Sequence, residues 1–360
     1  MSPNSRLGSV QAQLEQHRLN AILITHLPNI RYLCGFSGSA GVLTVTQRHA
    51  IFFTDGRYTE QAHAEVGEVK VIIRRGKSGI ASAIEWLAGR TSLRRIGIES
   101  TRVSVAERDV VAHSLGRTRR IVSAPPIVEQ MRMVKSSDEI TKIRTACELG
   151  VRLFDGLLHQ IRPGIPETEA AGKLEFAARK AGVDQMAFPT IVAGGKRSAL
   201  PHGRGSRAPL PRRGFVVCDF GVILSGYCSD MTRTLHIGRP TAEARRAYEA
   251  VREAQQAGLE AVKPGRTVGE VDSSARKLLY SKGLERFFTH STGHGLGLEI
   301  HEAPRVAAAQ RERLRPGMVI TVEPGVYLPG KWGVRIEDTV VVTESGCDIL
   351  TKCPKELLSL

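Results

Sequence analysis

The first 125 residues alternate between short apolar runs and amphipathic segments. Five runs rich in β-branched and aromatic residues are AILIT (21–25), GVLTVT (41–46), AIFFT (50–54), VKVIIRR (69–75) and RRIGIES (94–100). Such runs, split by turn residues, predict strands. The segments SVQAQLEQHRLN (9–20) and SGIASAIEWLAGR (78–90) have helical spacing. The pattern therefore predicts an α/β domain over residues 1–127, closed by Pro125-Pro126, with a second domain over 128–360.

A long amphipathic pattern follows this boundary. Ser137 precedes acidic residues, which predicts a helix N-cap there, and Pro163-Gly164 marks a stop. A second helical pattern ends near Gly182, a residue suited to a C-cap. We therefore expect two consecutive helices before the next β-rich region.

The C-terminal part repeats itself. The segment IRPGIPETEAAGKLEFAARKAG (161–182) resembles VKPGRTVGEVDSSARKLLYSKG (262–283) at a constant offset of 101 residues. Each copy follows a long helical pattern and precedes a β-rich region with a hairpin. A period this long predicts two half-domains related by a pseudo-two-fold axis, not a solenoid. A site at that axis would take residues from both halves.

The hairpin of the first half carries two acidic residues. In FVVCDFGVILSGYCSDMTRTLHI (215–237) we expect the turn at 224–226, with Asp219 and Asp230 symmetric about it. Directly opposed residues of an antiparallel pair have Cβ atoms about 4.5–5.5 Å apart. Two carboxylates so close repel unless a cation lies between them or one is protonated. Because the strand around Asp219 is apolar, solvated surface charges explain the pair less well.

The second half contains the same arrangement. In GMVITVEPGVYLPGKWGVRIEDTVVVT (317–343), Glu323 and Glu337 are symmetric about Gly330. Arg335 lies two residues before Glu337 and shares its face of the strand. It could hold a carboxylate or an oxyanion in place. Two acidic pairs in matching places of a repeated unit indicate one shared cation site.

The segment HSTGHGLGLEIHE (290–302) has three histidines and admits two interpretations. A phosphate-binding loop is disfavoured because no GxxxxGK[ST] motif occurs. Four carboxylates instead call for about two divalent cations, and an imidazole ligand, for which we choose His294, would complete the set. Oxygen ligands with one imidazole suit Mn²⁺, or Co²⁺ or Zn²⁺. For His294 alone, a satisfied core histidine is the plainer alternative.

Three further histidines are candidates for the same site. His202 and His301 occupy comparable places before the two hairpins. Such imidazoles can stabilise an oxyanion or transfer protons, so we assign both to catalysis and substrate binding, although each could be a structural loop histidine. His290 is expected to form a wall of the substrate pocket.

Composition narrows the class of protein. The net charge is +15 over 360 residues, but the 51 basic residues are dispersed and aromatic content is 5%, so we favour an Arg-rich surface over a nucleic-acid partner. No run of about 18 apolar residues exists, and we expect no membrane partner. The N-terminus lacks the apolar core of a secretory signal, and the six Cys form no CxxC pair. We expect a cytoplasmic protein.

These motifs resemble those of the Xaa-Pro peptidases, which comprise aminopeptidase P and the proline dipeptidases. The matching segments are ALPHG (199–203), CDFGVILSGYCSDMTRT (218–234), HSTGHGLGLEIHE (290–302), TVEPGVY (321–327) and VRIEDTVVV (334–342). GFSGSAGVLTVT (35–46) and FFTDGRYTEQA (52–62) resemble the creatinase-like domain that precedes the catalytic domain in this family. The resemblance implies a creatinase-like α/β domain followed by an α+β pita-bread domain. The family's ligand positions correspond to Asp219, Asp230, His294, Glu323 and Glu337, all present here.

The resemblance also implies an activity. We expect hydrolysis of an N-terminal Xaa-Pro bond through a metal-bridging hydroxide, with Glu323 as both ligand and proton carrier. Peptides with proline in the second position would be the substrates, and a homodimer the assembly. GFSGSAG and TDGRY favour an aminopeptidase. The alternatives are a dipeptidase, a catalytically silent binding protein of the same fold, a methionine aminopeptidase and a creatinase-like C–N hydrolase.

Overall fold

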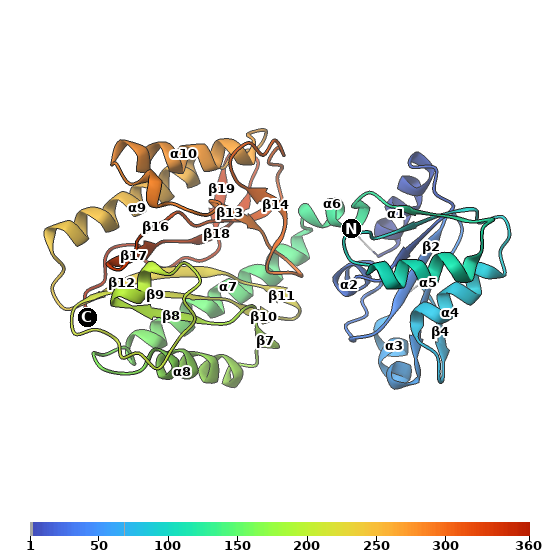
Figure 1. Cartoon of the computed structure of the whole chain (residues 1–360), viewed down its shortest axis with the longest axis horizontal. Coiled ribbons are helices and arrows are strands. Elements are labelled where there is room, and N and C mark those ends of the chain that lie inside the picture. Colours follow the sequence, from blue (N-terminus) through green and yellow to red (C-terminus); the bar gives the residue numbers. More distant parts are fainter. Residues whose placement is uncertain (1–2, 68) are drawn as a thin grey trace. The chain divides into compact units, whose positions relative to one another are not determined.

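The computed structural model describes residues 3–67 and 69–360 (Figure 1). The chain divides into two compact units, Met1–Arg132 and Met133–Leu360. The division falls at the end of α6 (Ile127–Met133), whereas the boundary predicted from Pro125-Pro126 lies at the start of that helix. Among the described residues, no helix combines the length and the apolar character needed to cross a membrane.

The first unit is an α/β domain, as the sequence predicts, with one six-stranded sheet that has one strand more than the five predicted. The strand order is β4-β3-β2-β1-β5-β6, with β2 antiparallel to its neighbours and the outer strands parallel to theirs. The strands are β1 (Ala21–Ile24), β2 (Val42–Thr46), β3 (Ala50–Asp55), β4 (Lys70–Arg74), β5 (Arg95–Ile98) and β6 (Arg120–Ser123). The helices are α1 (Pro3–Gln16), α2 (Leu27–Cys34), η1 (Gly56–Tyr58), α3 (Thr59–Glu65), α4 (Gly79–Ala88) and α5 (Val105–Leu115).

Helices cover both faces of this sheet. Ala21 and Leu23 of β1 pack in a core with Leu87 of α4 and Val111 of α5. The alternate residues of β1 point to the other face, where α1 lies against β2. Coverage on both sides explains why these strands read as continuous apolar runs rather than as alternating ones. The strand β6 and the helices α2, α3 and α5 were not predicted.

The second unit begins with two helices and repeats that order. The first half contains α7 (Ser137–Leu158), α8 (Glu167–Lys180), β7 (Gln185–Met186), β8 (Ile191–Gly194), η2 (Gly195–Ala199), β9 (Gly214–Phe220), β10 (Val222–Leu224), β11 (Tyr227–Cys228) and β12 (Met231–Ile237). The second contains α9 (Ala242–Ala261), α10 (Val268–Ser281), η3 (Glu285–Phe287), β13 (Gly293–Gly295), β14 (Glu302–Val306), β15 (Val319–Val322), β16 (Gly325–Leu328), β17 (Trp332–Arg335), β18 (Asp338–Val342) and β19 (Cys347–Ile349). The helix–helix–strand order thus occurs twice, as the internal repeat predicts.

The start of α7 differs from the prediction by one residue. Ser136, not Ser137, is the N-cap, because its side chain accepts from the Glu139 N–H while the Glu139 side chain accepts from the Ser136 N–H. A capping box requires a glutamate three residues after the N-cap serine, and Glu139 stands at that distance from Ser136 but not from Ser137. Helix α8 ends at Lys180, and Gly182 just beyond it adopts a left-handed φ of 83°. This conformation suits a glycine at the predicted C-terminal end of the helix.

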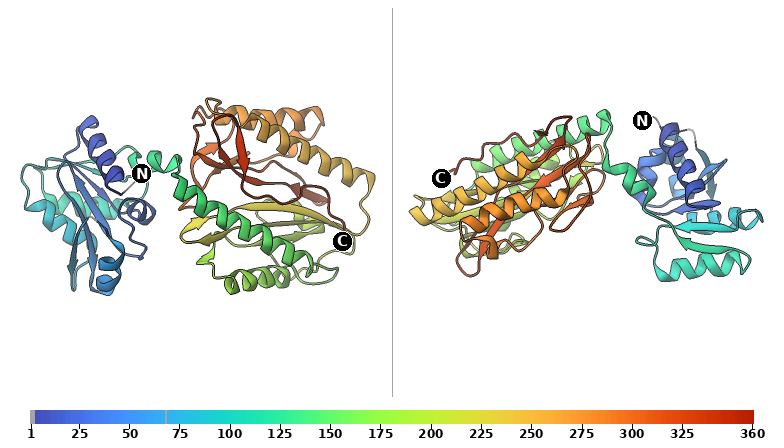
Figure 2. Two further views of the ribbon diagram at one scale, coloured as in Figure 1. Left: turned by 180° about the vertical axis from the view of Figure 1, so that it is seen from behind. Right: turned by 90° about the horizontal axis from the view of Figure 1, so that it is seen from above.

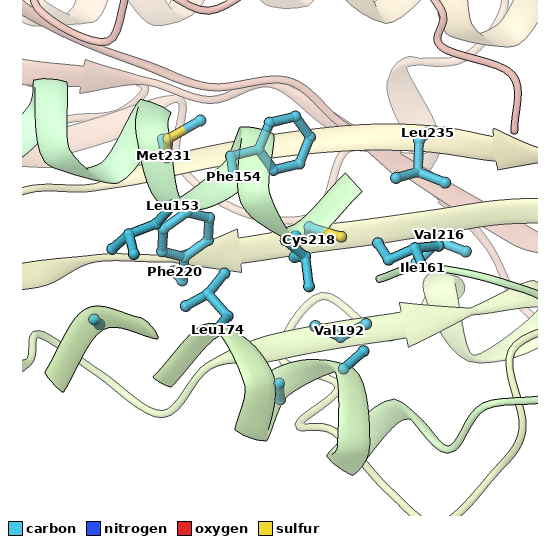
Figure 3. Packing of buried hydrophobic residues seen from close by; sticks show 14 of the residues in the cluster. Leu153, Phe154, Ile161, Leu174, Val192, Val216, Cys218, Phe220, Met231 and Leu235 are labelled. Atoms are coloured by element: carbon cyan, nitrogen blue, oxygen red, sulfur yellow. The ribbon is translucent and has the colours of Figure 1, made fainter. Parts of the chain in front are cut away.

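The helices of the second unit lie against its strands. The three-stranded sheet β12-β9-β8 belongs to the first half, and the five-stranded sheet β14-β13-β15-β18-β19 to the second. Helix α7 crosses behind the strands in Figure 1 and in front of them in the reverse view of Figure 2. Leu153 and Phe154 of α7 and Leu174 of α8 pack on Cys218 and Phe220 of β9 (Figure 3).

Strand alternation then decides which side chains face away from the helices. Because Cys218 and Phe220 point toward α7 and α8, Asp219 points to the opposite face of β9. In β15, Ile320 and Val322 pack in the second-half core, which leaves Thr321 on the opposite face. Asp219 and Thr321 therefore face the seam between the two halves, on the side of their strands away from the helices.

The seam is held by a buried ion pair that joins the two halves. Arg233 of β12 donates from Nη2 to Asp338 Oδ1 of β18 at 2.7 Å, and both side chains are at most 3% exposed. Asp338 also accepts from Thr351 Oγ1 (3.0 Å), Gln255 Nε2 (2.9 Å) and Lys355 Nζ (2.9 Å). Burial alone would raise the pKa of Asp338, but the charges of Arg233 and Lys355 hold it below its ordinary value. Asp338 therefore stays ionised.

Replacement of Asp338 by Ala should lower the free energy of unfolding by about 3–5 kcal/mol, because Arg233 is left as an unpaired buried charge. Urea-induced unfolding measures the change. The matched control is Asp348→Ala, since Asp348 pairs with Arg144 where both side chains are over 30% exposed, and this change should cost less than about 1 kcal/mol. Equal effects of the two substitutions would contradict the role given to the buried pair.

Candidate metal centre

The five predicted ligand residues come from five chain segments that converge on the seam. Asp219 lies near the end of β9 and Asp230 directly before β12. His294 lies in β13, Glu323 directly after β15 and Glu337 directly before β18. Both halves of the repeat therefore contribute, as a site at a pseudo-two-fold axis requires.

The predicted register of the first hairpin is wrong by two residues. Asp219 pairs with Thr232, so Asp230 lies diagonally from Asp219 instead of opposite it. The reason is the turn, which has two central residues, Ser225 (φ 52°) and Gly226 (φ 78°), between the paired Leu224 and Tyr227. Positive φ at both central residues is the feature of a tight type I′ hairpin turn, whose twist matches that of the strands.

The second hairpin has the predicted register. Val322 pairs with Asp338 in β15–β18, and Gly325 pairs with Arg335 in β16–β17. Both pairings place the centre of symmetry at Gly330, which has a φ of 73°. Glu323 and Glu337 lie between these two ladders, and neither residue takes part in the strand pairing of either ladder.

The ligand atoms of the candidate residues lie close together. His294 Nε2 is 3.6 Å from Asp230 Oδ2 and 3.5 Å from Glu323 Oε1. Asp230, His294 and Glu337 each offer an atom within 4.8 Å of the others, a spacing that could hold a metal ion. Asp219 lies close enough to interact with this group. Burial is the largest cause of the raised pKa of Glu337, and the negative charge of Asp219 is the next largest.

The carboxylates disfavour one another's ionisation. Burial raises the pKa of Asp230 and of Glu323 well above their ordinary values, and in each case the charge of Glu337 raises it further. Burial and Asp219 together raise the pKa of Glu337 to about 8. Such a cluster holds protons when no cation is bound, and a bound dication would reverse these shifts.

The donor set fits divalent cations. Three buried carboxylate oxygens, Asp219 Oδ1, Asp230 Oδ1 and Glu337 Oε1, have no hydrogen-bond partner within residues 3–67 and 69–360. Buried polar atoms are otherwise almost always paired, so these oxygens are open to a cation. Burial lowers the pKa of His294 to about 4, which keeps its imidazole neutral, the form that binds metal. Its Nδ1 lies 3.1 Å from the Gly295 carbonyl, an arrangement that directs Nε2 to the site.

Arg335 connects the carboxylates to the pocket wall. Its Nη2 donates to Asp219 Oδ2, and its Nε donates to Thr232 Oγ1 at 3.1 Å. Thr232 Oγ1 in turn donates to Glu337 Oε2 at 2.7 Å. One guanidinium thus fixes one carboxylate directly and a second through a hydroxyl, in agreement with the predicted shared face of Arg335 and Glu337.

The three accessory histidines also lie at this site. The His301 ring stands 4.3 Å from the His294 ring, centroid to centroid. Burial lowers the pKa of His301, and the charge of nearby His202 lowers it further. Burial and Arg335 lower the pKa of His290 to about 4, and its Nε2 accepts from the Tyr327 hydroxyl at 2.9 Å. His301 thus stands beside the ligand His294, and His202 is close enough to influence both His301 and His290.

The sequence did not indicate the polar residues that support these groups. Tyr327 donates to His290 while accepting from Arg335, and Thr321 donates to Glu323 Oε1 at 3.4 Å. Thr232 and Asp338 likewise went unnoticed. The sequence offers one indication for Asp338, because this residue directly follows the predicted ligand Glu337. Tyr327 and Thr321 are ordinary strand residues in the sequence, so only the folded chain shows their partners.

Comparison with known proteins agrees with the two-unit organisation. Residues 141–344 match metallopeptidase family M24, and residues 6–134 match the creatinase/prolidase N-terminal domain. The expected order, a creatinase-like α/β domain followed by a pita-bread catalytic domain, is confirmed by these matches and by the structural relatives.

The similarity extends over the whole chain. The Xaa-Pro dipeptidase of Pyrococcus horikoshii is 35% identical over 356 residues, which cover 99% of each protein. The structure of an Xaa-Pro dipeptidase from Bacillus anthracis is 36% identical, with a TM-score of 0.96 over 100% of both chains. The structure of an X-Pro aminopeptidase from Thermotoga maritima is 38% identical, with a TM-score of 0.88 over 97% of this chain and 100% of that one. The chain belongs to metallopeptidase family M24 and carries the creatinase/prolidase N-terminal domain.

Proposed function

We propose that the protein is a two-metal exopeptidase that hydrolyses the bond before proline in Xaa-Pro substrates, with dipeptides as the main class. The observation that carries this proposal is the convergence of four carboxylates and a neutral imidazole at one buried point, with three carboxylate oxygens left unpaired. The Xaa-Pro dipeptidases and prolidases among the relatives support the substrate class.

Asp219, Asp230, His294, Glu323 and Glu337 would hold two divalent cations, for which Mn²⁺ is our first choice and Co²⁺ or Zn²⁺ the alternatives. When bound, the ions would supply Lewis-acid activation of the attacking water and of the scissile carbonyl. Their charge would also offset the mutual repulsion of the four carboxylates.

The side chains have separate tasks in the proposed reaction. Glu323, partly exposed at 17% of its side chain, accepts the proton of the attacking water and delivers it to the leaving proline nitrogen. His301 and His202 donate hydrogen bonds to the oxyanion of the tetrahedral intermediate. Arg335 fixes Asp219 and Glu337, and His290 forms the wall beside Tyr327.

An Xaa-Pro aminopeptidase is the second candidate. The segments GFSGSAG (35–41) and TDGRY (54–58) favour it, and the Thermotoga maritima structure, with 38% identity, supports it. We rank the dipeptidase first because the Bacillus anthracis structure covers the whole chain with a higher TM-score.

We further propose a cytoplasmic location and a homodimer. All six cysteines are free, and five of them are buried, which suits a reducing compartment. The homodimer follows from the family resemblance alone, and sedimentation analysis would measure it.

Metal removal and substrate length test the activity. Protein treated with a chelator should lose hydrolysis of an Xaa-Pro dipeptide, and added Mn²⁺ should restore it. With Mn²⁺ present, kcat/KM for Ala-Pro should exceed that for Ala-Pro-Ala by at least about ten-fold if the dipeptidase assignment is right. A preference for the tripeptide would favour the aminopeptidase, and no hydrolysis of either would exclude both.

Replacement of Glu323 by Ala should reduce kcat by at least about 10²–10⁴-fold, because the proton carrier is lost. Steady-state kinetics on an Xaa-Pro dipeptide at saturating Mn²⁺ measures the change. Exposed Glu169 of α8 provides the control, since Glu169→Ala removes only a surface pair with Lys173. Wild-type kcat in the Glu323 variant would remove Glu323 from the mechanism.

The stability of the metal-free protein should fall as pH rises from about 5 to about 8. The pKa of Glu337 is raised from 4.5 to about 8, so the folded state holds a proton there that the unfolded state has lost, and unfolding becomes easier with rising pH. The raised pKa values of Asp230 and Glu323 act in the same direction. Thermal melting of chelated protein across this range measures the effect.

The Glu337→Gln variant should show a flatter dependence of the melting temperature on pH, since its side chain does not titrate. Added Mn²⁺ should change the sign of the dependence for the wild type, because cations displace the bound protons. A melting temperature that rises with pH in the chelated wild type would contradict the raised pKa values.

A further inference from the structure

Outside the five ligand positions, α8 and α10, the second helix of each half, each carry one buried acidic side chain. Glu167 is the first residue of α8, and Asp272 lies one turn into α10. They are 0% and 1% exposed. Each accepts hydrogen bonds from a loop that leads to residues of the metal centre, and neither has a part in the proposed reaction.

Glu167 gathers both ends of the loop that contains His202. Its Oε1 accepts from the Gly194 N–H at 2.9 Å, and its Oε2 accepts from Arg197 Nε at 2.8 Å. Oε2 also accepts from the N–H and the hydroxyl of Ser206, at 3.0 and 2.7 Å. Arg197 closes the arrangement by donating to the Arg204 carbonyl at 2.8 Å. One carboxylate therefore fixes residues on both sides of His202.

The tip of the same loop is fixed from the metal centre. Arg335 Nη1 donates to the Pro201 carbonyl at 3.0 Å, and Pro201 directly precedes His202. The base of the loop is thus anchored by Glu167 and its tip by the guanidinium that holds Asp219. His202 itself is exposed, so core packing does not position it.

Asp272 holds the segment before His294 in a comparable way. Its Oδ1 accepts from the N–H and the hydroxyl of Thr292, at 3.2 and 2.8 Å, and its Oδ2 accepts from Arg276 Nε at 2.8 Å. Arg276 donates to the carbonyls of Phe288 and His290 and lies over the Phe288 ring. The carboxylate and its arginine thus fix residues 288–292.

This second segment leads directly to a metal ligand. The Thr292 carbonyl accepts from the Glu323 N–H at 2.8 Å, and His294 lies two residues further along the chain. Thr292 is fully buried, and both its N–H and its hydroxyl donate to Asp272. The hydrogen-bond path from Asp272 therefore ends on Glu323, whereas the path from Glu167 ends on the exposed His202.

Charge-assisted bonds to a buried carboxylate are about twice as strong as neutral ones. Both helices are seated in apolar cores, through Leu174 of α8 and Leu279 of α10. The two carboxylates therefore tie the His202 loop and residues 288–292 to packed helices. Such support typically contributes about 10- to 100-fold to metal affinity or activity.

We propose that Glu167 and Asp272 are positioning residues with separate tasks. Glu167 fixes the His202 loop and so sets the rate of the chemical step. Asp272 fixes Thr292, and through it Glu323, and so sets metal affinity. The kinetic part of this inference rests on the proposed peptidase function, whereas the metal part does not.

The substitutions Glu167→Gln and Asp272→Asn keep side-chain size and remove the charge. In chelated protein titrated with Mn²⁺, calorimetry should give a Kd within about two-fold of wild type for E167Q and about 10- to 100-fold weaker for D272N. At saturating Mn²⁺, kcat on an Xaa-Pro dipeptide should fall at least about ten-fold for E167Q with KM little changed. For D272N, most of the lost activity should return as Mn²⁺ is raised.

Milder variants cover the case in which a charge removal prevents folding. Thr292→Val deletes one hydroxyl donor to Asp272, and Thr292→Ser restores it, so Mn²⁺ affinity should weaken and then recover. Ser206→Ala deletes one donor to Glu167 and should lower kcat alone. Two exposed ion pairs supply the controls: Glu169→Gln on α8 and Glu249→Gln on α9, which should leave both quantities unchanged.

A crossed result supports the inference, with Mn²⁺ affinity lost on the Asp272 side and kcat lost on the Glu167 side. Variants that melt at a lower temperature but keep wild-type Mn²⁺ affinity and kcat would overturn it, as would equal losses of affinity on both sides. A wild-type protein that binds Mn²⁺ yet leaves Xaa-Pro dipeptides uncut would refute the proposed function instead. In that case the role of Asp272 in metal affinity would still be tested by the calorimetric Kd of D272N for Mn²⁺.

Discussion

The mutual repulsion of buried carboxylates at the seam is the constraint around which the second unit is organised. Burial raises the pKa values of Asp230, Glu323 and Glu337, and the charges of neighbouring carboxylates raise each of them further. A fold that places them together is disfavoured in the absence of compensating charge. The surrounding structure must therefore hold them rigidly, and divalent cations would supply the compensation. The carboxylate cluster therefore lowers the stability of the folded protein unless divalent cations are bound.

Polar cross-links between the two halves supply this rigidity. Arg233 and Asp338 form the buried pair, and the hydroxyl of Thr234 both accepts from the Arg335 N–H and donates to its carbonyl. The Glu337 N–H donates to the Thr232 carbonyl at 3.1 Å. Strand β12 of the first half is therefore joined residue by residue to β17 and β18 of the second. The duplicated architecture gives each half its own apolar core, and the seam between them is where charged chemistry can be concentrated.

The functional groups divide into two kinds by their surroundings. The ligands stand on strands or directly beside them, in a buried network that fixes their geometry. The histidines proposed for catalysis stand on loops, where His202 is exposed and, by the inference above, depends on Glu167 for its position. A rigid metal centre with loop-borne histidines suits a peptidase, because the nucleophile must be fixed while the substrate must enter and leave.

The sequence by itself determined the residues that meet at the seam. Strand alternation, the 101-residue repeat and the two acidic pairs indicate the cluster from the sequence, because period-2 patterns and hairpin symmetry are local properties. It failed at the first hairpin, where a two-residue turn at Ser225-Gly226 moved Asp230 away from Asp219. It also missed Asp272, although that carboxylate lies on the apolar stripe of α10 with Val268, Ala275 and Leu279. Only the tertiary structure decided that Glu337 binds the Thr232 hydroxyl and Asp219 the Arg335 guanidinium, because those partners come from segments about 100 residues away and no local pattern records them.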